Sequence, residues 1–480
     1  MVPKVLHRVA RNTASLLTSE LTNRASTFIV YALVGRYLGT VAFGQLSLAL
    51  TFFYLFQVCA VAGLRSFVTR EVAKDKTTAS QYVLHGGIIV AAFSLGSFAI
   101  LMLVVWLMGY ATDTAFCIIL LSLGLFPTTF AMVCESVLQA WERMHYIAYV
   151  QVPVHVMKVV LAFVLLSRGF SLHSIIGVLL AAHLAIAAVE WWVIRRSTLF
   201  VPGHVDVDLC WNLIKAASTF LRIDIIIATA SSIDMLSLSK FGSERDVALF
   251  NAARQLFTPM QMICLNFQMS LFPLLCRKYA SSFRDLQEFY EQVLEVLLFV
   301  TLPVVIGLFF FADGILALLY GEKFVPASIA VRIMVWHLLL TTLTGLLGQV
   351  LVASQHEKIT LRIVAIDWVV HAVCAMLLVS TCGLIGAALS GLLTRLVDVC
   401  FHGIFVSRLL AKLRVLRLAW KPVVASLGML LPLLGINYEG RILALICAGI
   451  VYATVVLAMT LWESGGVAQM KTRYLSLWVE

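Results

Sequence analysis

Long apolar runs, each close to the length of one membrane crossing, recur along the whole chain between short polar segments. A helix needs about 20 apolar residues to cross a bilayer. The runs are continuous, whereas membrane-spanning strands alternate polar and apolar positions, so the pattern predicts helices. Fourteen spans are expected, at about 15–35, 43–64, 82–108, 115–138, 146–166, 172–193, 216–239, 248–275, 291–311, 328–353, 359–379, 384–407, 421–435 and 442–462. The thirteenth is short and holds Lys421, Pro422 and Pro432, so counts of twelve and thirteen stay open.

A weak internal repeat indicates two related halves. The fourth span ends in VLQA at 137–140 and the tenth in VLVA at 350–353, six spans later. Because six is even, both halves enter the membrane from the same side, as parallel repeats about an axis along the membrane normal do. Chance similarity in Leu/Val/Ala-rich sequence is an equal alternative. The predicted organisation is one six-helix bundle over 1–200, a second over 201–410, and two further helices with a cytoplasmic tail over 411–480.

Composition excludes a soluble domain. Hydrophobic residues make up 61% of the 480 and charged residues 12%, with a mean hydropathy of +0.97, whereas soluble proteins carry about 25% charged residues. No predicted loop much exceeds twenty residues, which leaves no room for a catalytic domain, and no glycine-rich phosphate loop is present. We therefore expect no enzyme activity, and energy from an ion gradient or from the substrate gradient. The ten cysteines lack Cys-x-x-Cys spacing, so neither disulfide, metal nor other cofactor is expected.

The basic residues predict topology rather than nucleic-acid binding, despite a net charge of +10. With the N-terminus inside, the predicted cytoplasmic segments hold 23 of the 35 lysines and arginines, counting Arg362 and Lys421 at the cytoplasmic ends of their spans, and the external loops hold six. Cytoplasmic loops of membrane proteins are enriched in Lys and Arg. The distribution predicts a multi-pass protein of the inner (cytoplasmic) membrane with both termini in the cytoplasm, for an even number of spans.

The first span carries a polar stripe. Glu20, Asn23, Arg24 and Thr27 follow the i, i+3, i+4, i+7 spacing of one helix face. A charge at the centre of a spanning helix costs about 2.5–3.5 kcal/mol, so this face lines an aqueous cavity or is satisfied by pairing. A local Glu20–Arg24 pair with a structural role is the alternative.

The eighth span repeats this spacing with Asn251, Arg254, Gln255 and Thr258. No acid on this helix is within reach of Arg254, so its partner is expected on another helix or in a substrate. Lys158 is a single charge in the fifth span, equally open to a lumenal or a structural role. Candidate substrate-binding residues are Arg24, Arg254, Asn23, Asn251, Gln255 and Lys158.

Acidic and histidine residues in the last spans are candidates for ion coupling. Asp367 and His371 lie one turn apart near mid-membrane, where they either exchange protons or make structural hydrogen bonds. Arg395 and Asp398 share a face with His402 and can pair within their helix. The candidates are Asp367, His371 and Asp398. Glu295 and Arg332 lie near span ends, and their side chains are expected to extend to the membrane–water interface.

Several segments resemble the Wzx-type polysaccharide flippases. They are VGRYLGTVAFGQLSLAL (34–50), AGLRSFVTREVAKDK (62–76), FGSERDVALFNAARQL (241–256), ILALLYGEKFVPASIAVRIM (315–334) and GLIGAALSGLLTR (383–395). The resemblance implies two six-helix bundles, shared with MATE-type multidrug exporters and MurJ-type lipid II flippases. It also implies export of undecaprenyl-pyrophosphate-linked sugar repeat units by alternating access, often coupled to an ion gradient. Lumen-facing arginines of helices one and eight in such flippases match Arg24 and Arg254 by helix and polar face.

The predicted function is therefore flipping of lipid-linked oligosaccharide, with membrane lipids and a polysaccharide polymerase or export machinery as partners. Arginine suits a pyrophosphate head because its fork of donors matches phosphate oxygens. Acids also lie inside the spans, among them Glu20, Asp367 and Asp398, so a cationic lumen is not assured. The alternatives are a MATE-type cation antiporter, which needs an acidic and aromatic cavity, and a membrane-embedded polymerase or ligase, which commonly needs a large external loop.

Overall fold

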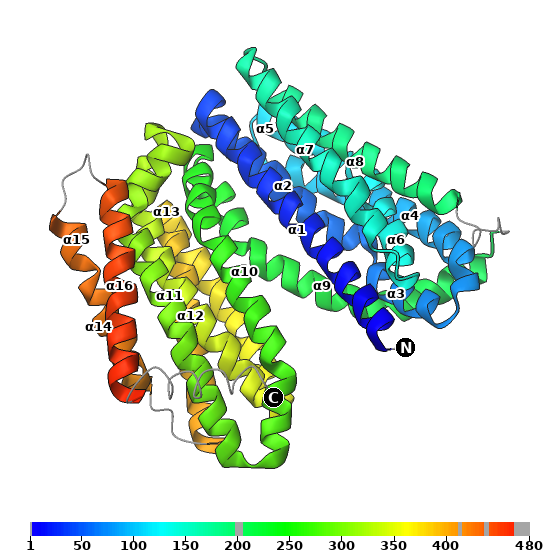
Figure 1. Cartoon of the computed structure of the whole chain (residues 1–480). Coiled ribbons are helices and arrows are strands. Elements are labelled where there is room, and N and C mark those ends of the chain that lie inside the picture. Colours follow the sequence, from blue (N-terminus) through cyan, green and yellow to red (C-terminus); the bar gives the residue numbers. More distant parts are fainter. Residues whose placement is uncertain (1, 197–204, 411–414, 436–440, 465–480) are drawn as a thin grey trace. The chain divides into compact units, whose positions relative to one another are not determined.

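The computed structural model describes residues 2–196, 205–410, 415–435 and 441–464, and it contains helices and no strands within them (Figure 1). The chain divides into two compact units. Unit 1 comprises Met1–Asn251 and Leu318–Phe324, and unit 2 comprises Ala252–Ala317 and Val325–Glu480. The all-helical membrane fold that the sequence predicts is confirmed. The domain boundaries predicted at 200 and 410 stay a prediction.

Unit 1 contains the first nine α-helices. They are α1 (Val2–Leu38), α2 (Thr40–Val61), α3 (Leu64–Lys74), α4 (Ala79–Met108), α5 (Thr112–Ser122), α6 (Leu125–Ala140), α7 (His145–Ser167), α8 (Leu172–Arg195) and α9 (Val207–Phe241), with a 3-10 turn η1 at Lys76–Thr78. A buried apolar core joins α3, α4, α6, α8 and α9.

Helix α10 (Glu244–Ser281) begins in unit 1 and continues into unit 2. Unit 2 also holds α11 (Phe283–Tyr320), η2 (Glu322–Ala327), α12 (Ser328–Ala353), α13 (Glu357–Leu409), α14 (Val415–Gly428), α15 (Leu430–Gly435) and α16 (Arg441–Ser464), except where Leu318–Phe324 belongs to unit 1. Only Ser282 separates α10 from α11. The predicted loop over 276–290 is therefore helical almost throughout, since both helices extend beyond their apolar runs.

Most predicted spans correspond to helices. By length and composition, eight helical segments of the described residues are long and apolar enough to cross a membrane. Helices α1, α9 and α10, whose polar faces carry charge, are not among the eight. Helix α13 combines the predicted spans 359–379 and 384–407, which meet at a kink at Gly383, where φ is +54°. Asp367 before the kink contacts Arg395 after it, so the two halves fold back on each other as two spans.

The predicted fourth span is interrupted. Helices α5 and α6 are separated at Leu123 and Gly124. A Cβ at Gly124 would lie 2.8 Å from His183 Nδ1, so a larger residue here would displace the His183 ring of α8. The predicted thirteenth span is likewise divided, into the short helices α14 and α15.

The expectation that Glu295 reaches the membrane interface is wrong. Glu295 on α11 is 5% exposed, and its Oε1 accepts a hydrogen bond from Lys421 Nζ of α14 at 2.8 Å. The sequence could not show this partner, because the two residues are 126 positions apart. Arg332, which was also expected to reach the membrane interface, forms an ion pair with Asp313 at 2.6 Å. The Glu295–Lys421 pair fastens α14 to α11 inside unit 2.

Removing one partner of this buried pair is expected to destabilise unit 2. Lys421→Met leaves the Glu295 carboxylate without its counter-charge, which costs about 3–5 kcal/mol at comparable sites. We expect a lower melting temperature for the purified variant in detergent. The double variant Glu295→Gln/Lys421→Met removes both charges and is expected to recover most of the loss. A single variant that melts with the wild type contradicts this interpretation.

Candidate functional site

Helix α1 carries its polar face in unit 1, and an ion pair is formed on it. Arg24 Nε lies 2.6 Å from Glu20 Oε1, and each side chain keeps 50% of its surface exposed. The carbonyl oxygen of Asn23 accepts hydrogen bonds from Ser26 and Thr27. The local pair expected from the i, i+4 spacing is therefore present, and its half-exposure leaves the guanidinium open to a ligand. That this face lines a substrate cavity stays a prediction.

A second arginine, Arg65, is presented at the start of α3. The turn before it depends on Gly63, whose φ of +69° is a left-handed conformation that glycine adopts without strain. A Cβ at Gly63 would lie 2.6 Å from the carbonyl oxygen of Ala217, so glycine also lets α9 pack against the turn. Arg65 Nη2 lies 3.4 Å from Glu135 Oε2 on α6. The turn thus directs a half-exposed guanidinium at an acid whose side chain is 13% exposed.

A cavity of about 300 Å³ lies between α2 and α9, near these pairs. Its lining includes Tyr54 from α2 and Asp224 from α9. Tyr54 is within electrostatic range of Glu20 and Arg24, and Asp224 is within range of Arg65. Charged groups of both signs therefore gather in one region of unit 1. We call the following six residues the arginine site: Glu20, Arg24, Tyr54, Arg65, Glu135 and Asp224.

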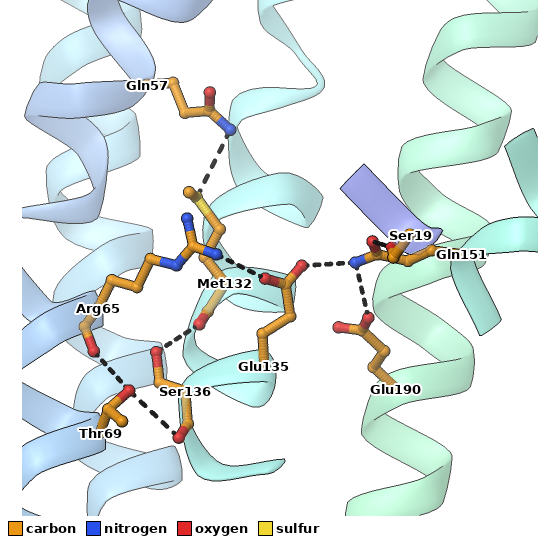
Figure 2. A network of polar contacts seen from close by, with 9 residues as sticks. All are labelled: Ser19, Gln57, Arg65, Thr69, Met132, Glu135, Ser136, Gln151 and Glu190. Carbon is orange, nitrogen blue, oxygen red and sulfur yellow. Dashed lines mark hydrogen bonds and ion pairs between the residues drawn. The ribbon is translucent and has the colours of Figure 1, made fainter. Parts of the chain in front are cut away.

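Behind the arginine site lies a further carboxylate, that of Glu190, which is buried. Gln151 Nε2 on α7 donates to Glu135 Oε1 at 2.7 Å and to Glu190 Oε1 on α8 at 3.2 Å. Ser19 on α1 donates to the amide oxygen of Gln151, which fixes the orientation of that amide. Figure 2 shows Arg65 and Gln151 reaching Glu135 from opposite sides. Glu190 is fully buried (0% exposed), and its Oε2 has no hydrogen-bond partner among the described residues.

The other predicted substrate-binding residues have different surroundings. Asn251 is buried, and its Nδ2 donates to Ser47 Oγ of α2 at 2.8 Å, which fastens the start of α10 within unit 1. Lys158 on α7 is also buried, with His155 and His183 in electrostatic range. Lys158 makes neither a hydrogen bond nor an ion pair within the part of the chain described.

Arg254 and Gln255 are half-buried on α10, in unit 2. The Arg254 carbonyl accepts a hydrogen bond from Thr258 one turn on, at 2.8 Å. The polar face predicted for this helix thus begins in unit 1 at Asn251 and continues into unit 2. Whether these side chains contact substrate stays a prediction.

Two of the three predicted ion-coupling residues, Asp367 and Asp398, belong to an arginine-centred network in unit 2. Arg395 Nη1 lies 2.7 Å from Asp398 Oδ2 and 3.3 Å from Asp367 Oδ2, and His402 Nδ1 lies 2.7 Å from Asp398 Oδ1. The expected Arg395–Asp398 pair is confirmed. Asp367 meets Arg395 across the α13 kink, a contact that the spacing of its own helix did not indicate. The Asp367–His371 relay stays a prediction.

Six residues of the arginine site and the cluster behind it were not predicted as site residues: Tyr54, Arg65, Glu135, Gln151, Glu190 and Asp224. Arg65 falls between the predicted spans 43–64 and 82–108, because α3 is short and amphipathic rather than apolar. Glu190 and Gln151 lie inside predicted spans. Glu190 could have been identified from the sequence, since it is the one acid in the predicted span 172–193, and an acid inside a span is a functional candidate by default.

Comparisons with known proteins agree with this architecture. The family model described as polysaccharide biosynthesis protein matches residues 9–278, more than half of the chain, and the MatE model matches residues 222–377. Comparison with curated protein sequences finds no match.

Three solved structures share the fold. The chain is similar to the lipid II flippase MurJ in an inward closed conformation, with 13% identity, 92% and 98% of the two chains covered and a TM-score of 0.71. An inward-facing multidrug resistance MATE family transporter of the MOP superfamily has 16% identity and a TM-score of 0.66, with 80% of this chain and 95% of the transporter covered. A MOP superfamily transporter from Pyrococcus furiosus, described by the reverse polarity of its binding pocket, has 14% identity and a TM-score of 0.54, with 83% of this chain and 95% of the transporter covered. At these identities the likeness establishes the fold alone.

Proposed function

The chain belongs to the polysaccharide biosynthesis protein family, and from this premise we propose that it is a membrane flippase. The proposed cargo is an oligosaccharide repeat unit linked through pyrophosphate to undecaprenol, which crosses the cytoplasmic membrane by alternating access. The family assignment, the multi-pass helical architecture and the fold shared with a lipid II flippase support this proposal. The protein moves the lipid without changing it chemically.

The observation that carries the proposal is the pairing of two half-exposed arginines with carboxylates near a cavity. Arg24 is held by Glu20 and Arg65 by Glu135. A guanidinium binds carboxylate and phosphate oxygens through the same fork of donors. A pyrophosphate carries more negative charge than one carboxylate, so it displaces the acid from its arginine. The acids hold the arginines in place when no head group is bound, and the lipid tail stays in the bilayer.

Residues beyond the arginine site contribute in the proposed transport cycle. We assign Arg254 in unit 2 to the head group as well, with Asn23 and Gln255 as polar contacts to the head or its sugars. Asn251 and Lys158 are buried, so their participation requires a helix rearrangement during transport. Coupling to an ion gradient is assigned to Asp367, His371 and Asp398, in whose network Arg395 already supplies one positive charge.

The proposed orientation places both termini and α3 in the cytoplasm, because basic residues concentrate there in the sequence. A single cysteine at position 70, in a variant that lacks the ten native cysteines, is expected to react with an impermeant thiol reagent only after cells are permeabilised. Arg70 is exposed, so access to the reagent is not limiting. A cysteine in place of exposed Lys323 is the matched control and is expected to react in intact cells. Reaction at position 70 in intact cells overturns this topology.

A cation antiporter is the second candidate, and the MatE match over 222–377 favours it. Such a transporter needs free acidic groups for its cargo. In the arginine site, however, two of the three acids, Glu20 and Glu135, are each already bound by an arginine, which leaves Asp224 as the one acid there without an ion pair among the described residues. An organic cation would therefore have to break two ion pairs and meet two positive charges. An anionic cargo is instead attracted by both arginines.

Depletion of the protein tests the proposed function in cells. We expect lipid-linked oligosaccharide to accumulate in the membrane and surface polysaccharide to fall, because synthesis continues while transfer to the outer leaflet stops. Mass spectrometry of extracted lipids measures the accumulation and identifies the sugars. Re-expression is the control and restores both quantities. Unchanged lipid-linked sugars combined with greater sensitivity to cationic drugs would favour the antiporter.

A further inference from the structure

Two glutamates of unit 1 share one hydrogen-bond donor inside the helix bundle. We call Glu135 and Glu190 the glutamate pair. Gln151 Nε2 donates to one oxygen of each, at 2.7 and 3.2 Å, while the second oxygen of Glu135 faces Arg65. The second oxygen of Glu190 is buried and has no hydrogen-bond partner among the described residues. An oxygen in this position either loses its hydration without compensation or carries a proton.

The charges around the glutamate pair do not balance two ionised carboxylates. Among the described residues, the charged groups within electrostatic range are Arg65 from α3, at 3.4 Å from Glu135, and Glu20 from α1, which Arg24 already neutralises. Cys134 of α6 is the other titratable group in range. One arginine, which is also within range of Asp224 on α9, therefore serves both acids of the pair. Neighbouring buried carboxylates with a single counter-charge share a proton, because ionising both is too costly.

The local geometry favours a proton over a metal ion. A cation bridging two carboxylates sits between their oxygens, and that position is occupied by the donating amide group of Gln151. The hydrogen bond from Ser19 to the amide oxygen holds the amide in this orientation. A proton needs no such space, since it is carried on one carboxyl oxygen.

We propose that the glutamate pair is a proton-binding site whose occupancy is linked to the partner of Arg65. The pair holds one proton while Arg65 faces Glu135. When an anionic head group takes Arg65, as the proposed function requires, Glu135 loses its counter-charge and the pair takes up a second proton from water. The linkage is reciprocal, so protonation of the pair also frees Arg65 for the head group. The glutamate pair thus ties head-group binding to proton uptake, apart from the Asp367–Arg395–Asp398 network of unit 2.

The resting proton is tested without any substrate. Infrared spectra of the purified full-length protein, recorded as a function of pH, are expected to show the C=O stretch of a protonated carboxylic acid that persists at neutral pH. Glu190→Gln is expected to remove that band, whereas Glu288→Gln, a change at an exposed glutamate on α11, leaves it intact. A wild-type spectrum without this band at neutral pH overturns the shared proton. Persistence of the band in Glu135→Gln, Glu190→Gln and their double variant also overturns it.

The linkage is tested with undecaprenyl pyrophosphate as the probe, bound to the protein in lipid nanodiscs. Uptake of one proton on binding makes the wild-type Kd rise with pH by up to about tenfold per unit. Glu135→Gln is expected to bind with a Kd independent of pH, and Glu288→Gln to keep the wild-type slope. The proton site is overturned if the wild-type Kd does not change with pH, or if it changes with Na⁺ concentration at constant pH. Either result leaves the flippase proposal intact. Absence of any binding by the wild type instead contradicts the proposed function.

Discussion

Cells that carry the Arg24→Ala/Arg254→Ala double variant are expected to export no measurable lipid-linked polysaccharide, although the protein still inserts. Charge-assisted hydrogen bonds contribute about 1.5–3 kcal/mol each, so losing both arginines weakens head-group binding on the order of a hundredfold or more. The exposed Glu20–Arg24 pair contributes only about 0.3–0.5 kcal/mol to stability, as i, i+4 pairs do. Loss of Arg24 is therefore expected to affect the site rather than the fold, and the amount of inserted protein shows whether the same holds for Arg254.

Conservative variants separate charge from geometry at the same two positions. Arg24→Lys and Arg254→Lys keep the positive charge but lose the fork of donors, so partial export is expected from each. Arg284→Ala on α11, which breaks an exposed i, i+4 pair with Glu288, is the matched control and is expected to export normally. Surface polysaccharide is measured relative to the amount of protein in the membrane. Full export from a well-expressed double alanine variant would rule out both arginines as head-group ligands.

Arg65→Gln is expected to reduce surface polysaccharide at least about tenfold. The change removes a guanidinium proposed to hold the head group, and it also leaves Glu135 without its counter-charge. Arg70→Gln is the matched control, because Arg70 lies on the same helix, is similarly exposed and pairs with Glu71 at the surface. Its export is expected to match the wild type.

A double variant distinguishes the two effects of losing Arg65. Arg65→Gln/Glu135→Gln removes the uncompensated acid, so the melting temperature is expected to recover towards that of the wild type. Export is expected to stay low, since the head-group ligand is still missing. If export recovers together with stability, Arg65 has a structural role only and the arginine site loses one of its two cations.

The helices and their local pairs were predictable because both depend on residues close in sequence. Apolar runs of spanning length mark α4, α7, α8 and α12, and the structure places each helix within a few residues of its predicted span. Glu20–Arg24 and Arg395–Asp398 are pairs at i, i+4 and i, i+3, which helix geometry alone brings together.

The clusters that carry the proposals were not predictable, because their members come from distant helices. Arg65 and Glu135 are 70 residues apart, and Gln151 and Glu190 are 39 apart. One sequence contains no information on which helix faces meet. Arg65 was also hidden by its helix, since α3 has too few apolar residues to be recognised as an element of the bundle.

Transfer of the lipid in a reconstituted system tests the central claim most directly. Purified protein is placed in liposomes that contain undecaprenyl-pyrophosphate oligosaccharide, with a pH gradient imposed, and the fraction of head groups accessible from outside is followed in time. The account predicts rapid transfer by the wild type, transfer at the protein-free rate by Arg24→Ala/Arg254→Ala, and no competition from an organic cation. Transfer by the wild type at the rate of protein-free liposomes would contradict it.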